Sequence, residues 1–222
     1  MHTKMAWLGL CCIGILLAGC GEKKGLENEL ILDEKYQKID HIHSFANCDS
    51  PQGEYTTELL SYTDGTFYFT QIVDADNPLF KVKLDSENKA FLLDSLDNVL
   101  DTLPKTAALM IRGHDFHRIQ TQPEKVFRNV MYSNNKEGGL DVFTGKDNLD
   151  NEVKLYYDRK ARHISHVEMI NPVDTTQLIE IIHQDWLDTD FGKMAKEIAI
   201  IQAGTDTFFF DFQYVKINED VN

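Results

Sequence analysis

The sequence predicts a mainly β fold in the α+β class: a curved antiparallel sheet, or half-open β-barrel, with a small helical lid. Apolar and polar residues alternate with the period of a strand over most of the chain from residue 36. Turn residues separate these short runs at regular intervals, which is typical of an antiparallel meander and not of alternating strands and helices. Only residues 104–131 depart from the period, and they hold the predicted helices.

The first half of the folded region holds five predicted strands. They cover residues 39–46, 54–62, 66–73, 79–84 and 90–93. Asp64-Gly65 separates two of these runs, and an Asp-Gly pair between alternating segments is a strong signal for a β-hairpin. We therefore expect neighbours in the sequence to pair as neighbours in the sheet.

The break in the strand period begins at Pro104. A proline at a first-turn position, followed by KTAALMIRGHDFHRI, predicts a helix that frays near Gly113. A second short helix is predicted from Pro123. These helices are the predicted lid.

Strands resume after Gly138-Gly139 and continue almost to the end of the chain. They are predicted over residues 140–143, 153–157, 163–169, 177–183, 197–202 and 207–217, with turn residues between them. Because side chains alternate across a strand, the last of these is predicted to carry an aromatic face.

The aromatic face is the candidate binding surface. It is read from alternate positions of the last strand and from a second, shorter aromatic face: Phe208, Phe210, Phe212 and Tyr214, with Phe67 and Phe69. A sheet with one aromatic face and few helices to cover it predicts an apolar cavity lined by these side chains. A fully packed core is the equally weighted alternative.

The N-terminal segment resembles a bacterial lipoprotein signal. Lys4 is followed by an apolar run, Met5 to Leu16, that is shorter than the roughly 20 residues of a membrane-spanning helix. Leu17-Ala18-Gly19-Cys20 then resembles a lipobox, in which signal peptidase II cuts before the cysteine and the thiol carries diacylglycerol. The alternative is an ordinary signal peptide that happens to contain a cysteine.

This resemblance sets the predicted organisation and location of the chain. It implies lipidation of Cys20 and attachment to a membrane of the cell envelope, with Gly21 favouring the outer membrane of a Gram-negative bacterium. The predicted parts are a signal peptide (1–19), a lipidated N-terminus and tether (20–35), a single β domain (36–218) and a tail (219–222).

The composition excludes one class of partner and one kind of cross-link. With 36 acidic and 22 basic side chains, the net charge is −14, whereas a nucleic-acid binder needs clustered Lys and Arg. Cys11 and Cys12 would leave with the signal peptide and Cys20 would be acylated. Only Cys48 would remain, so we expect no internal disulfide. A small half-buried hydrophobe is the favoured interpretation of Cys48, and a reactive thiol is the alternative.

The last strands resemble a known family of envelope proteins. Asp185-Trp186 precede Gly192-Lys193-Met194-Ala195-Lys196-Glu197-Ile198, and the Phe208–Phe212 run is followed by Val215-Lys216-Ile217-Asn218. This order is similar to the C-terminal end of LolA-like lipoprotein-sorting proteins, although Ala195 lies where many relatives have proline. The resemblance implies a half-open barrel whose concave face holds acyl chains or another apolar ligand. LolA-type carriers are soluble, whereas this chain carries a lipobox, as lipidated LolB-type receptors do, so the resemblance bears on the fold more than on a sorting role.

Histidine pairs give a rival interpretation. Six of the eight histidines form close pairs: His41/His43, His114/His117 and His163/His166. The first two pairs share one face of a strand or helix, and such pairs can bind zinc. No HExxH motif is present, however, and His163 and His166 are predicted on opposite faces.

A group of polar residues lies near the end of the first predicted helix. It comprises Arg112, His114, Asp115 and His117. These side chains could line a polar mouth above an apolar cavity, but ordinary exposed charges at a helix end are the favoured interpretation.

The sequence therefore predicts a membrane-anchored lipoprotein that binds a lipid, acyl chain or other apolar ligand in envelope lipid or lipoprotein handling, without catalytic residues, metal or cofactor. Its partners would be that ligand and the membrane, reached through Cys20. The alternatives are a metal-dependent envelope hydrolase and a structural lipoprotein with no ligand.

Overall fold

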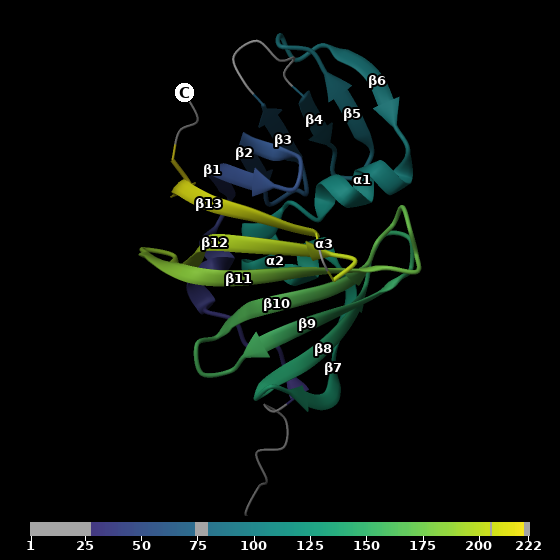
Figure 1. Ribbon diagram of the computed structural model, residues 1–222. Helices are drawn as coiled ribbons and strands as arrows, with labels where there is room; N and C mark the ends of the chain where they lie inside the picture. Colours follow the sequence, from purple (N-terminus) through teal and green to yellow (C-terminus); the bar gives the residue numbers. More distant parts are fainter. Residues whose placement is uncertain (1–27, 74–79, 205, 220–222) are drawn as a thin grey trace, which may run out of the picture.

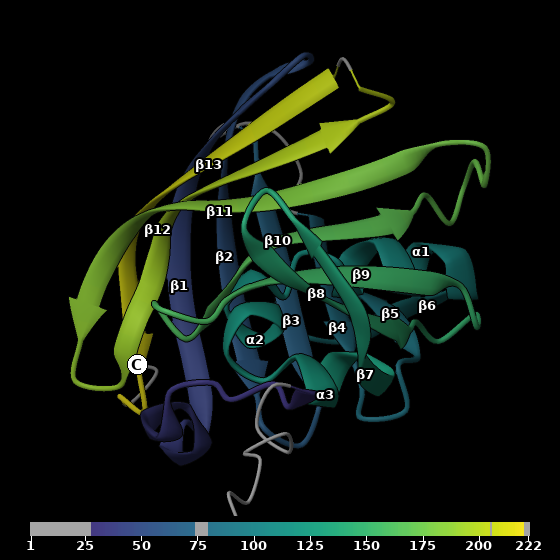
Figure 2. The same ribbon diagram turned by 90° about the horizontal axis from the view of Figure 1, so that it is seen from below.

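One large curved sheet dominates the computed structural model, which describes residues 28–73, 80–204 and 206–219. All the strands of these residues belong to a single thirteen-stranded antiparallel sheet that does not close into a barrel (Figure 1). Three helices lie inside its curve (Figure 2). The predicted mainly β class, curved antiparallel sheet and small helical lid are confirmed.

The sheet has two arms that meet at its centre. The N-terminal arm comprises β1 (His41–Ser50), β2 (Gly53–Tyr62), β3 (Phe67–Ile72), β4 (Phe80–Leu84), β5 (Ala90–Leu93) and β6 (Val99–Leu103). The C-terminal arm comprises β7 (Arg128–Glu137), β8 (Leu140–Lys146), β9 (Glu152–Asp158), β10 (His163–Ile170), β11 (Leu178–Thr189), β12 (Gly192–Gln202) and β13 (Asp206–Ile217). Pairing of β1 with β13 joins the arms, so β6 and β7 are the two edges.

The helical segment runs from one edge strand to the other. It contains α1 (Lys105–Arg112), α2 (Phe116–Thr121) and α3 (Pro123–Val126), which lie between β6 and β7 in the sequence. Since these strands are at opposite edges of an open sheet, the connection crosses its concave side (Figure 2). The topology therefore places the helices over the inner face.

Most predicted strands match, and the Asp-Gly hairpin forms as expected. The Tyr62 amide donates to the Thr66 carbonyl at 2.9 Å, and Gly65 takes a positive φ of 92°. The two edge strands, β6 and β7, were not predicted. Their side chains are mostly exposed, so the sequence carries no buried alternation to mark them.

The chain packs on the sheet from Leu30 onward. Leu30 and Leu32 lie against the main core, and the Tyr157 hydroxyl donates to the Ile31 carbonyl. A short 3₁₀ helix, η2 (Glu34–Lys38), follows. The predicted signal peptide, Cys20 and the first part of the predicted tether lie outside the described residues.

The main core lies between the concave face and the helices, with apolar side chains from both arms and from α1, α2 and α3. Burial of each large side chain stabilises the fold by about 1.5–3 kcal/mol. A smaller cluster forms beneath η2 from Tyr36, Ile39, Ile42, Met194 and Ile217. In the described part of the chain, no helix is long and apolar enough to span a membrane.

Candidate ligand-binding face beneath the helices

Four of the predicted aromatic side chains lie together in the interior. Phe67, Phe69, Phe210 and Phe212 are buried in the main core, as alternation along β3 and β13 requires. The ring of Phe116, at the start of α2, lies 5.0 Å from that of Phe210. The concave face is therefore aromatic, and α2 covers its centre.

Two further aromatic residues of β13 lie differently. Phe208 is half-buried against the core. Tyr214 lies on the outer face, where its ring stacks on Phe45 at 5.9 Å. A β-bulge causes this change: Phe45 pairs with Tyr214 but Ala46 pairs with Phe212, so Gln213 is left unpaired.

The regular alternation predicted for this strand is therefore wrong after Phe212. Val215, not Tyr214, takes the next inward position against the core. Because the side-chain period of a strand is two, the one extra residue moves every later side chain to the opposite face.

Helix side chains fill the space above the concave face. Leu109 and Met110 of α1 approach the sheet, and only about 20 Å³ remains between them and the strands. This small cavity is also lined by Gly113, His114, Met169, Ile179, Ile181, Ile200 and Gln202. Helix α1 is thus packed closely on β10, β11 and β12 in this conformation.

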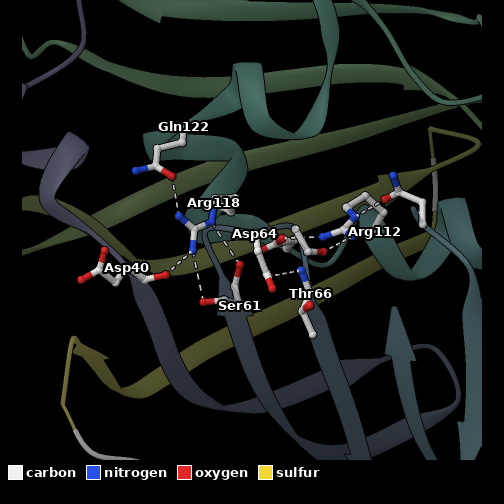
Figure 3. A network of polar contacts seen from close by, with 10 residues as sticks. Asp40, Ser61, Asp64, Thr66, Arg112, Arg118 and Gln122 are labelled. Carbon is white, nitrogen blue, oxygen red and sulfur yellow. Dashed lines mark hydrogen bonds and ion pairs between the residues drawn. The ribbon is translucent and has the colours of Figure 1, made fainter. Parts of the chain in front are cut away.

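A buried polar network holds the end of α1 to the N-terminal arm (Figure 3). Arg112 Nη1 donates to Asp115 Oδ2 at 3.0 Å, and both side chains are buried. Arg112 Nη2 donates to the Gly65 carbonyl at 2.6 Å, and Nε donates to Asn88 Oδ1 at 2.9 Å. One guanidinium therefore links the helix to two turns of the sheet.

Arg118 makes a second link, from α2 to β2 (Figure 3). Its Nη2 donates to the Ser61 carbonyl at 3.1 Å and its Nε donates to Ser61 Oγ at 3.2 Å. Nη1 donates to Gln122 Oε1. Burial lowers the pKa of Arg118, which the nearby Asp115 opposes.

The other side of α2 is bound to β12. Gln120 Nε2 donates to the Lys193 carbonyl at 2.7 Å, and its Oε1 accepts from the Ala195 amide at 3.1 Å. The Ala195 carbonyl lies 2.9 Å from His117 Nε2. Helices α1, α2 and α3 have no side-chain N-cap. Hydrogen bonds to the sheet backbone, added to apolar packing, therefore hold α2 in place.

The interpretation of Arg112, His114, Asp115 and His117 as exposed helix-end charges is wrong. Arg112, Asp115 and His117 are buried, and His114 is half-buried among Phe69, Phe116 and Phe210. The chain turns inward after α1, which directs these groups at the sheet. Burial lowers the pKa of His117 to about 4, so its ring is neutral at pH 7.

The paired histidines have different contacts, although His117, His163 and His166 all lie near enough to His183 to lower its pKa. His41 and His43 share the outer face of β1, where His43 Nε2 lies 2.7 Å from Glu58 Oε1. His163 stacks on Trp186 at 3.8 Å. His166 stacks on Tyr156 at 4.5 Å.

No three His, Cys, Asp or Glu side chains of residues 28–73, 80–204 and 206–219 lie so that they could hold a metal ion. Cys48 is buried, and burial raises the pKa of its thiol to about 12. Cys48 is therefore more deeply buried than the half-buried side chain that the sequence predicts.

One polar side chain on the concave face was missed by the sequence analysis. His183 follows Ile179 and Ile181 at alternate positions of β11 and is 4% exposed. It is the only buried side chain of the described strands β11, β12 and β13 that carries a polar group. A single histidine in an apolar run has no second histidine at a spacing that would indicate a site. Its position two residues after Ile181 does, however, predict that it lies on the same face of the strand as Ile181.

Solved structures of other proteins have a similar fold. No family model and no curated protein matches the sequence. The structure is similar to that of a LolA superfamily protein from Nitrosomonas europaea, with a TM-score of 0.61, 10% identity, and coverage of 87% of this chain and 93% of the other. A DUF1329 family protein from Desulfovibrio piger gives a TM-score of 0.57 at 10% identity, with 85% and 90% covered.

A third similar structure is an outer membrane lipoprotein-sorting protein domain from Vibrio parahaemolyticus. Its TM-score is 0.53 at 13% identity, and the match covers 86% of this chain and 89% of that one. The matches cover 85–87% of the chain, far more than the C-terminal strands that suggested the family. The chain therefore has a LolA-like fold.

Proposed function

We propose that this protein is a membrane-anchored envelope lipoprotein that binds a lipid or acyl chain between the concave face of the sheet and the helices. The observation that carries the proposal is the inner face of β11, β12 and β13. Its buried side chains are apolar except for His183, and three short helices cover them. An apolar ligand gains affinity by removing such surface from water.

Ligand entry between α1 and strands β10, β11 and β12 requires the helices to move, because only about 20 Å³ is free there. A bound chain would replace helix side chains such as Leu109, Met110 and Phe116, so one apolar cover would be exchanged for another. The hydrogen bonds of Arg112, Arg118 and Gln120 would favour the closed state until a ligand is bound.

The names of two similar proteins support envelope lipid or lipoprotein handling as the setting. One is described as a LolA superfamily protein and another as an outer membrane lipoprotein-sorting domain. Likeness in fold does not fix function, so the proposal rests on the concave face itself. Phe67, Phe69, Phe208, Phe210 and Phe212 remain the proposed lining. Tyr214 is left out, because its ring lies outside.

The binding test uses residues 20–222 with Cys20→Ser, the form that the lipobox predicts without its anchor. We expect saturable binding of a fluorescent long-chain fatty acid and a matching adduct in native mass spectrometry. A protein that binds neither would be a structural lipoprotein with a packed core.

A locked helix gives the matched control. Met110 and Gln202 line the same small cavity from α1 and β12. Cysteines at both positions, in a Cys48→Ala background, can be joined by a short thiol cross-linker. Binding should be lost in the cross-linked protein and kept in the single Met110→Cys variant treated in the same way. Equal binding by both would place the ligand elsewhere.

Anchoring is tested separately in the full chain. Cys20→Ala should abolish incorporation of an alkyne-labelled fatty acid and release the protein from the membrane fraction on high-salt washing. Cys48→Ala is the control and should be labelled normally. Labelling that survives Cys20→Ala would contradict the lipobox interpretation.

A further inference from the structure

His183 is a buried polar side chain whose hydrogen-bonding groups have no partner in the closed protein. Neither Nδ1 nor Nε2 forms a hydrogen bond with a described residue. The Phe116 backbone lies close enough to favour the protonated ring, yet burial dominates and lowers the pKa of His183 to about 3. The ring is therefore neutral at pH 7, with one N–H donor and one acceptor.

An unpaired buried donor destabilises a fold, and such groups are rare in native proteins. An apolar side chain of similar size at position 183 would avoid that penalty among its neighbours Ile179, Ile181 and Ile198. The polar group therefore calls for a role that the closed structure does not supply.

The surroundings of His183 change if the helices lift. His117 of α2 is near enough to lower its pKa, and the His117 ring lies against Phe212 at 4.6 Å. When α2 leaves, His117 leaves with it, while His183 stays on β11. Among the side chains of β11, β12 and β13 that are buried in the closed protein, His183 would then be the one polar group on the newly exposed inner face.

We propose that His183 is a specificity-determining residue that hydrogen-bonds the ester or amide carbonyl of an acylated ligand lying on the concave face. This inference rests on the proposed function and names its substrate class. A neutral imidazole donates to a carbonyl oxygen without a charge being buried. A plain hydrocarbon leaves the donor unpaired, and sites with buried polar groups discriminate against ligands that cannot pair with them.

The test compares two photoreactive probes on the full chain in vesicles of diether phosphatidylcholine, a lipid without carbonyl groups. One probe is a long-chain alkane with a diazirine, and the other is a fatty acid methyl ester with the diazirine at the same carbon. Labelling of peptides from residues 163–217 is quantified by mass spectrometry. The ratio of ester to alkane labelling is compared between variants, which cancels the partitioning of each probe into the vesicles.

We expect His183→Leu to lower the ester-to-alkane ratio by about two- to ten-fold, the range that one neutral hydrogen bond supports. His183→Gln, which keeps a donor, should retain most of the preference. His41→Leu is the matched control on the outer face of β1 and should leave the ratio unchanged. His183→Leu is expected to fold, because it removes an unpaired group, and His183→Gln covers the case in which it does not.

The outcomes separate the two proposals. Equal ratios in the wild type and in both His183 variants, with the inner-face peptides labelled, would overturn the role of His183 and leave ligand binding standing. Labelling of these peptides by neither probe in the wild type would overturn the proposed function, and the inference with it.

Discussion

Arg112 and Asp115 form an ion pair that is almost completely withdrawn from water. The Nη1–Oδ2 distance is 3.0 Å, and the two side chains are 6% and 2% exposed. Breaking a buried pair from one side leaves an uncompensated charge, which is far more damaging than losing an exposed pair.

Asp115→Ala should therefore lower the free energy of unfolding by about 3–5 kcal/mol. Urea denaturation followed by Trp fluorescence measures the change. Asp188→Ala is the control, because Asp188 pairs with Lys193 but is 84% exposed, and its loss should cost less than about 1 kcal/mol. Similar losses of unfolding free energy in both variants would show that the buried ion pair stabilises the fold no more than an exposed pair does.

Gln120→Ala should loosen α2. The change leaves the Ala195 amide of β12 without its side-chain partner and removes one of the two side-chain donors to the Lys193 carbonyl, at a cost of about 1–3 kcal/mol. The rate of amide hydrogen exchange should increase more in α2 than in β2 or β9. The control is Gln213→Ala, since Gln213 is exposed and bonds only Asp211. An unchanged rate of hydrogen exchange in α2 would show that Gln120 does not hold this helix on β12.

Acid should destabilise the fold through two buried histidines. Burial lowers the pKa of His117 from 6.5 to about 4 and that of His183 to about 3. Below pH 6.5 the unfolded chain takes up protons that the folded chain excludes. The free energy of unfolding therefore falls as the pH falls, until each folded-state pKa is reached.

Each histidine contributes a slope of about 1.4 kcal/mol per pH unit within its window. His183→Leu should remove one of these contributions. Denaturation midpoints measured at several pH values below 6.5 test this. Parallel pH profiles for the wild type and the variant would contradict it.

Gly192→Ala should damage the turn between β11 and β12. Gly192 has a φ of +104°, and an added Cβ would lie 2.8 Å from Cε1 of the buried Tyr36. The Tyr36 hydroxyl also donates to the Lys193 carbonyl at 2.6 Å, which limits any shift of the ring. Both backbone strain and overlap are therefore expected.

Gly53→Ala isolates the contribution of the overlap, because Gly53 has a similar φ of +120° but no atom within 4 Å of an added Cβ. We expect Gly192→Ala to lower the melting temperature clearly more than Gly53→Ala, with an extra loss of about 1–3 kcal/mol. Equal shifts would mean that Tyr36 yields to the methyl group.

The sequence predicted those parts of the fold in which one face of a strand is buried. Runs such as 54–62 and 66–73 show the alternation because water lies on one side and the core on the other. Strand β7 is a ten-residue strand of mostly exposed side chains, so its pattern carries no such contrast. The bulge at Gln213 is also invisible to a rule that assumes a strict period of two.

The candidate site was predicted only in part. The aromatic face could be read from Phe210 and Phe212, because it depends on local alternation. The Arg112–Asp115 pair and the contact of Arg118 with Ser61 depend on where the helical segment meets the sheet, which no local pattern encodes. His183 could not be predicted, because a single histidine in an apolar run has no partner at a spacing that indicates a site.

The pairing of β1 with β13 has a consequence for the order of folding. Each arm is a meander with short turns, so each can form from local contacts. Joining them closes a loop that contains nearly the whole folded chain, for example at Ile42 and Ile217. Until β13 is synthesised, β1 and β12 are open sheet edges that can pair with other chains. We therefore expect aggregation to start at these two edges, late in translation.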